Sequence, residues 1–107
     1  MPLTDDILDS SYALCEEFGP RGRIPREERL KEKFPQLSTS ELHEVLDRVD
    51  QVSKTVWSIA ERGGGRKLKR QKIIEELQRQ HPFLRHEGLT TATFLVDYYA
   101  WHEGYDR

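Results

Sequence analysis

Basic side chains crowd a run of three glycines near the middle of the chain. Residues 62–72 read RGGGRKLKRQK, so six of these eleven residues are Arg or Lys. Arg and Lys bind the phosphate groups of nucleic acids, and free N–H groups in a glycine loop add to the attraction for anions. The candidate phosphate contacts are Arg62, Arg66, Lys67, Lys69, Arg70 and Lys72. The P-loop pattern G-x-x-x-x-G-K-[ST] is absent, so a nucleotide-binding loop is not predicted.

A second set of polar side chains follows Pro82, where a final helix is expected to begin. Arg85, His86 and Thr90 would lie on the exposed start of that helix and could contact phosphates and base edges. The corresponding helix start in the first half carries carboxylates such as Glu41 and Glu44, which would repel phosphates. The sequence therefore places any DNA or RNA binding in the second half. The alternative is that these residues form a solvated loop and an ordinary helical corner.

An aromatic run near the C-terminus is the other group with chemical potential. At helical spacing, one face would carry Phe94, Tyr98, Trp101 and Tyr105, and the opposite face Leu89, Ala92, Val96 and Tyr99. Tyr and Trp are enriched at interface hot spots, so the first face predicts a surface for a partner protein or a second copy of the chain. The alternative is that these rings complete the core, with their polar groups at its rim.

The sequence predicts no enzyme, cofactor or metal site, and no small-molecule ligand is indicated. The four histidines lack metal-ligand spacing, H-E-x-x-H is absent, and the single cysteine, Cys15, cannot complete a zinc site. No nucleophile has a base at a recognisable spacing, so no catalytic residue is assigned. Cys15 is expected to be a small buried apolar residue.

Charge and composition limit the partners further. The net charge is −2, but residues 1–61 carry 8 Lys or Arg against 13 Asp or Glu, net −5, whereas residues 62–107 carry 9 against 6, net +3. A nucleic-acid surface therefore belongs to the second half. No apolar run approaches the ~20 residues of a membrane span. With one cysteine and no signal-peptide pattern at the start, we expect a cytoplasmic protein without a membrane partner.

Five helices are expected to position these side chains. An N-terminal helix would span 4–18 and begin at Thr4. A helix from Pro25 to Phe34 and a long helix from Ser38 to about Arg62 would make one unit, residues 25–62. Ser38 and Glu41 have the spacing of a capping box, and Leu37 and Leu42 that of a hydrophobic staple.

The long helix is the predicted spine, since its apolar residues recur every three or four positions: Leu42, Val45, Val49, Val52, Val56 and Ile59. One glycine after it would take the left-handed conformation, with slack from the others. Helices from about Lys67 to His81 and His86 to Gly104 would form a second unit, residues 66–105.

The two units resemble each other, because Phe34-Pro-Gln-Leu37 recurs as His81-Pro-Phe-Leu84 at an offset of 47 residues. The predicted fold is thus one all-α domain, residues 1–107: a five-helix bundle of two helix-turn-helix-like units and an N-terminal helix. Function is not determined by the sequence. The two hypotheses are a small non-enzymatic regulator that contacts nucleic acid, and a protein-interaction or homo-oligomerisation module.

Overall fold

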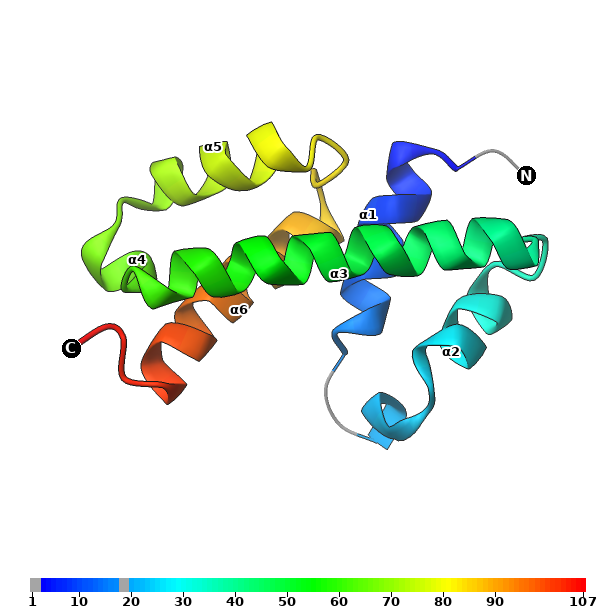
Figure 1. The fold of residues 1–107 in the computed structure, drawn as a ribbon, viewed down its shortest axis with the longest axis horizontal. Helices are drawn as coiled ribbons and strands as arrows, with labels where there is room; N and C mark the ends of the chain where they lie inside the picture. The colour runs from blue at the N-terminus through cyan, green and yellow to red at the C-terminus, as the bar shows by residue number, and fades with distance from the viewer. Residues whose placement is uncertain (1–2, 18–19) are drawn as a thin grey trace.

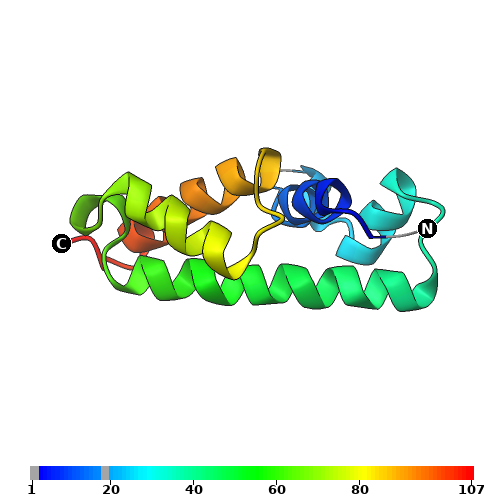
Figure 2. The same cartoon turned by 90° about the horizontal axis from the view of Figure 1, so that it is seen from above.

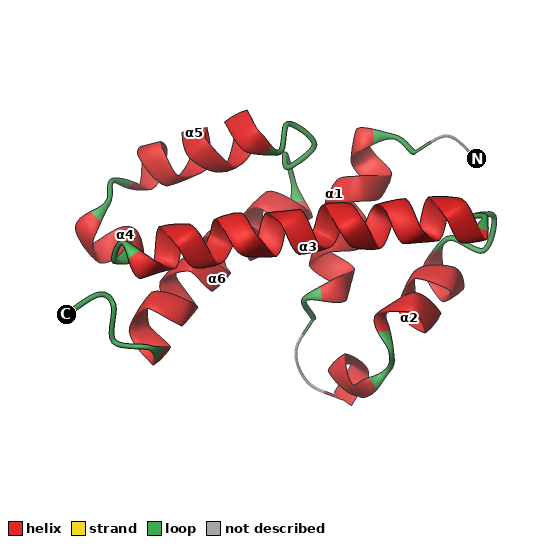
Figure 3. Ribbon diagram, in the orientation of Figure 1, coloured by secondary structure: helices red, strands yellow, loops and turns green. Residues whose placement is uncertain are grey.

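The computed structural model describes residues 3–17 and 20–107, and its backbone is helical almost throughout (Figure 1, Figure 3). These residues contain no strand, which confirms the predicted all-α class. The elements are α1 (Asp5–Cys15), a 3₁₀ turn (Pro20–Arg23), α2 (Arg26–Lys33), α3 (Thr39–Glu61), α4 (Gly64–Lys67), α5 (Arg70–Gln80) and α6 (Glu87–His102).

The long helix α3 begins as its sequence predicts. The Ser38 hydroxyl accepts a hydrogen bond from the Glu41 N–H at 3.1 Å, and the Ser38 N–H donates to Glu41 Oε1 at 2.8 Å, so the capping box is formed. Glu41 also lies in the first turn, where the helix dipole favours a carboxylate. The hydrogen bond from the Ser38 backbone is the main reason that the pKa of Glu41 is lowered.

The valine-rich stripe of α3 forms one wall of the core. The residues Val45, Val49, Val52, Val56 and Ile59 are at most 1% exposed. Figure 2 shows the reason: α3 runs the length of the molecule and the other helices lie along one side of it. Since α1 and α6 cross this wall while α2 and α5 cover its two ends, the spine prediction is confirmed.

Some element boundaries differ from the prediction. The described residues form six α-helices, because Gly64–Lys67 makes a separate turn, α4, before the chain extends at Leu68 and Lys69. The first helix ends at Cys15, and the predicted end at residue 18 lies outside the described residues. Cys15 is 6% exposed, as expected for an apolar core residue.

The two proline corners have nearly the same backbone. At Phe34 the φ and ψ angles are −127° and 70°, and at His81 they are −134° and 78°. In each corner the leucine N–H donates to the carbonyl three residues earlier, at 3.1 Å for Leu37 and 3.0 Å for Leu84. Both leucines are buried. Among the described residues, no helix combines the length and apolar character needed to cross a bilayer.

Candidate binding surface on helix α6 and the glycine loop

The glycine run holds the end of α3 against α6. Gly63 has a φ of 106° and donates its N–H to Ala60 O at 2.9 Å, which ends α3 in the expected left-handed turn. Gly64 also has a positive φ, 56°, and a Cβ placed on it would lie 3.0 Å from the Ala100 Cβ. Gly64 is therefore a packing contact with α6, and the predicted slack is absent there.

Asp97 of α6 joins α6 to the two helices that follow the glycine run. Its Oδ1 accepts the N–H of Gly65 in α4 at 2.8 Å, and its Oδ2 accepts a hydrogen bond from the Arg70 guanidinium at 2.6 Å. A Cβ on Gly65 would lie 2.8 Å from Asp97 Oδ1, so any larger residue there would displace the carboxylate from this position. Asp97 thus holds α4 and the start of α5 at the C-terminal half of α6.

A groove of about 440 Å³ opens beside this junction. It is lined by Gly63, Gly65, Arg66, Arg70, Asp97, Ala100, Trp101 and Asp106. The basic run and the aromatic helix were separate candidates in the sequence, and the groove brings Arg66 and Arg70 of the first together with Trp101 of the second. The site can therefore offer guanidinium donors and an exposed indole to the same ligand.

The aromatic face of α6, defined as Phe94, Tyr98, Trp101 and Tyr105, points away from the core. In the described structure, the large apolar side chains that remain exposed are Phe94 at 55%, Trp101 at 65% and Tyr105 at 37%. The Tyr98 ring lies 6.1 Å from both the Phe94 ring and the Trp101 ring, measured between centroids. These rings do not complete the core.

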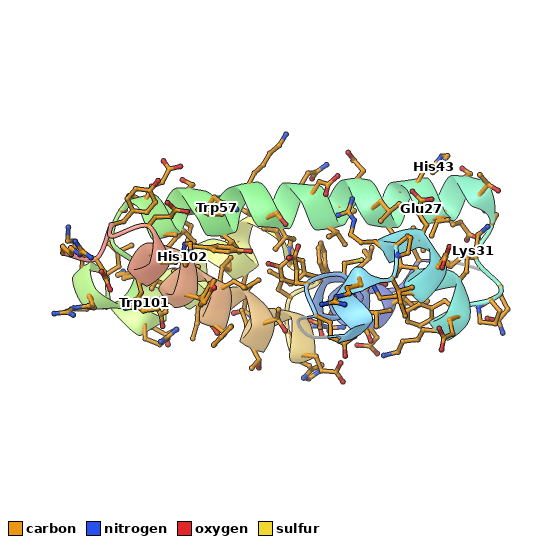
Figure 4. All side chains as sticks on the ribbon, turned by 90° about the horizontal axis from the view of Figure 1, so that it is seen from below. Glu27, Lys31, His43, Trp57, Trp101 and His102 are labelled. Atoms are coloured by element: carbon orange, nitrogen blue, oxygen red, sulfur yellow. The ribbon has the colours of Figure 1, made fainter. Side chains whose placement is uncertain are left out.

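The opposite side of α6 is packed inward. The fully buried residues of that side are Ala92, Leu95, Val96 and Ala100, of which Leu95 and Ala100 were not predicted. At the edge of the core, Tyr99 stacks on Trp57 of α3 with centroids 4.0 Å apart and planes 8° apart. Burial is the main cause of the raised pKa of Tyr99. Figure 4 shows Trp57 on α3 and Trp101 and His102 on the neighbouring α6.

Four of the predicted nucleic-acid contacts pair with carboxylates of the chain itself. Arg62 pairs with Glu76, Arg70 with Asp97, Lys72 with Glu75 at 3.5 Å, and Arg85 with Asp6 at 3.2 Å. Within residues 3–17 and 20–107, no carboxylate is within ion-pair distance of Arg66, Lys67 or Lys69. The remaining predicted contacts, His86 and Thr90, are exposed at the N-terminal end of α6, away from the groove.

The N-terminus of α6 is capped by a residue that the sequence did not indicate. Asp9 of α1 is 3% exposed. Its Oδ1 accepts the N–H groups of Arg85 at 2.8 Å and His86 at 3.2 Å, and its Oδ2 accepts that of Gly88 at 3.2 Å. The only sequence signal was negative: His86 stands at the N-cap position without a Ser, Thr, Asp or Asn side chain to cap the helix.

His81 is the buried titratable group nearest the second corner. It is 7% exposed, and its Nε2 lies 2.8 Å from the hydroxyl of Thr55, which is also buried on α3. Burial is the main cause of the lowered pKa of His81, and the charge of Arg48 adds to it. The imidazole is therefore held neutral inside the fold.

Neither a metal site in the described part of the chain nor a known relative assigns a function to this surface. Over the described ranges, no three His, Cys, Asp or Glu side chains are grouped closely enough to hold a metal ion. No protein-family model, curated protein or solved structure matches the chain. The geometry of the α6 surface is therefore the basis on which a function can be inferred.

Proposed function

We propose that the protein is a non-enzymatic binding module that docks a segment of another protein on the aromatic face of α6. One observation carries this proposal: Phe94, Trp101 and Tyr105, the large apolar side chains exposed in the described structure, all belong to α6 or the turn that follows it. Exposed aromatic rings on one helix face are typical of interaction sites, where Trp and Tyr contribute most of the binding energy. A cytoplasmic location, which rests on the sequence alone, is part of the proposal.

The anchoring of α6 supports this proposal. Asp9 fixes the N-terminal end of the helix, Asp97 joins its middle to α4 and α5, and its inner side is packed in the core. The backbone that carries the rings is therefore pre-organised, and a partner would lose less conformational entropy on binding than it would on a mobile segment.

The test is a selection of peptides from a random phage-displayed library on the immobilised full chain, followed by measurement of each affinity. Enriched peptides are expected to lose about tenfold in affinity on Trp101→Ala and Phe94→Ala, as hot-spot truncations do. His43→Ala, at an exposed position of α3, is the matched control and is expected to change nothing. No enrichment, or affinities indifferent to both aromatic truncations, would refute the proposal.

A second copy of the chain is one alternative occupant of this face. Sedimentation over a range of concentrations decides it, because self-association predicts a mass that rises with concentration and falls in Trp101→Ala. A strict monomer at high concentration eliminates the homodimer and leaves the other-protein proposal in place.

Single-stranded nucleic acid is the second candidate function, favoured by Arg66, Lys67 and Lys69. These cations have no carboxylate partner in the described structure, and Arg66 shares the groove with Trp101. Single strands bind where cations track the phosphates and aromatic rings stack on the bases. The duplex version, with the second unit as a helix-turn-helix, has less support because Asp9 occupies the start of α6 and Asp6 pairs with Arg85.

A labelled single strand and a labelled duplex test this candidate in a salt series. Binding through phosphates requires affinity that falls steeply with salt, and its loss when Arg66, Lys67, Lys69 and Arg70 are all changed to Gln. Absence of any binding at low salt would eliminate the candidate.

A further inference from the structure

We propose that the groove beside Trp101 holds an acidic side chain of the docked partner segment, with a neighbouring apolar side chain of that segment on the indole. This inference rests on the proposed function and specifies the chemistry of its partner. It arises from the groove that Trp101, an exposed ring of α6, shares with Arg66 and Arg70 of the glycine loop and the start of α5.

Some charges of the groove are already neutralised by partners within the chain. Both carboxylate oxygens of Asp97 accept hydrogen bonds, one from the Gly65 N–H and one from Arg70. Arg70 uses one of its five N–H donors in that pair, so donors remain. Arg66 lines the groove without a carboxylate partner among the described residues. The charged donors still available in the groove are therefore guanidinium groups, which bind carboxylates in a bidentate manner.

The charges in and around the groove indicate which ligand charge it can accept. The lining of the groove is itself balanced, with Arg66 and Arg70 against Asp97 and Asp106, and Lys67 and Lys69 of the same loop add two positive charges outside that lining. Arg70 and Asp97 neutralise each other. Arg66, Lys67 and Lys69, which have no carboxylate partner among the described residues, then stand against Asp106, so the remaining local charge is positive and favours an anionic group. A single carboxylate matches this balance better than a phosphate chain, which would bring a charge with every nucleotide close to Asp97 and Asp106.

The size and shape of the groove suit a short peptide segment. A groove of about 440 Å³ is within the range of small-ligand pockets, and its walls at Gly63 and Gly65 carry no side chains. A peptide in the groove could reach both Arg66 and Trp101, because both line it. A peptide with an acidic residue next to a large apolar residue fits this groove. Its apolar side chain would pack on the aromatic anchor, and its acidic side chain would bind the charged groups at the rim.

The experiment follows the two indole N–H signals of the full chain by NMR. The probes are a short peptide of repeated Glu-Leu-Leu, the same peptide with Gln in place of Glu, and a uridine oligonucleotide. The Glu peptide is expected to shift the Trp101 signal to saturation while the Trp57 signal stays in place. Arg66→Gln and the Gln peptide are each expected to weaken binding about tenfold, since each removes a charge-assisted hydrogen bond. Arg79→Gln, at an exposed position of α5, is the control.

Each outcome has one meaning. If the Glu and Gln peptides bind equally, or Arg66→Gln binds as well as the unchanged chain, the acidic-partner inference is overturned while docking on the aromatic face survives. If neither peptide shifts Trp101, the inference is overturned and the library selection decides the proposed function independently. A shift caused by the oligonucleotide alone overturns it in favour of nucleic acid.

Discussion

The corner between α2 and α3 and the corner between α5 and α6 share a backbone but start the next helix in different ways. In the first, Ser38 and Glu41 cap α3 from within four residues of chain. In the second, the cap of α6 is Asp9, which is 79 residues before Gly88. One corner is therefore complete as a local unit, whereas the other is complete only when α1 is in place.

This difference also separates scaffold from candidate site. The first corner begins α3, whose apolar stripe is buried along its length. The second begins α6, whose inner side is buried while Phe94 and Trp101 remain exposed. Because some of its aromatic rings are exposed, α6 buries less apolar surface against the core. Hydrogen bonds to Asp9 at its start and to Asp97 in its C-terminal half provide additional anchoring.

Asp9→Ala is expected to have the largest effect on the second corner. It would leave the N–H groups of Arg85, His86 and Gly88 without their acceptor, in part-buried or buried positions. We expect a loss of about 3 kcal/mol in the free energy of unfolding, measured by urea denaturation. Asp9→Asn, which retains one carbonyl oxygen, should lose less. If Asp9→Ala lowered the free energy of unfolding no more than Ser38→Ala does, the difference drawn between the two corners would be wrong.

Gly88→Ala tests the close approach of α1 and α6. A Cβ at this position would lie 2.5 Å from the Asp9 carbonyl oxygen, which is backbone and cannot rotate away. We expect a loss of about 2 kcal/mol in the free energy of unfolding, as is usual for overpacking. The control is Thr90→Ala, one turn into the exposed side of the same helix, where the change should stay within about 0.5 kcal/mol. Equal effects at the two positions would refute the contact.

Ser38→Ala measures the local cap of the first corner. It removes one of the two reciprocal hydrogen bonds of the box, and we expect a loss of about 1 kcal/mol in the free energy of unfolding. Ser40→Ala, an exposed neighbour outside the box, is the control. Because the corners are separate, the losses of Ser38→Ala and Asp9→Ala should add in the double variant. Strong non-additivity would show that the two corners are coupled.

The smallest expected effect is a pH dependence confined to the second corner. His81 has a lowered pKa in the folded chain and an ordinary value near 6.5 when unfolded, so below about pH 6.5 the unfolded state binds more protons. The contribution of His81 to stability is therefore complete above that pH and decreases as the pH falls. Phe34, its counterpart, does not titrate. The free energy of unfolding of His81→Gln should vary less with pH between about 5 and 7; an unchanged slope would contradict this account.

The parts of the fold that could be predicted from the sequence depend on residues close together in the chain. The capping box joins residues three apart, and the stripe from Val45 to Ile59 lies on one uninterrupted helix. The Asp9 cap depends on contacts between distant residues, as does the Asp97 junction, in which Asp97 is 32 residues from Gly65. Spacing rules carry no information about such contacts.

The candidate site shows the same division between local and distant contacts. Helical spacing predicted that Phe94, Tyr98 and Trp101 share one face, and in the structure that face points outward. Spacing could not show that Trp101 and Arg66 line one groove, because that depends on Gly64 packing against Ala100. Nor could it show that Arg62 and Arg70 pair with Glu76 and Asp97.

The most direct test of the α6 surface is fluorescence quenching of Trp101 in the full chain carrying Trp57→Phe, which leaves one indole. The account predicts emission at long wavelength and ready quenching, because Trp101 is 65% exposed. It also predicts that iodide quenches more strongly than caesium, because Arg66 in the groove and Lys67 and Lys69 of the same loop have no carboxylate partner among the described residues. Short-wavelength emission with little quenching, or stronger quenching by caesium, would contradict it.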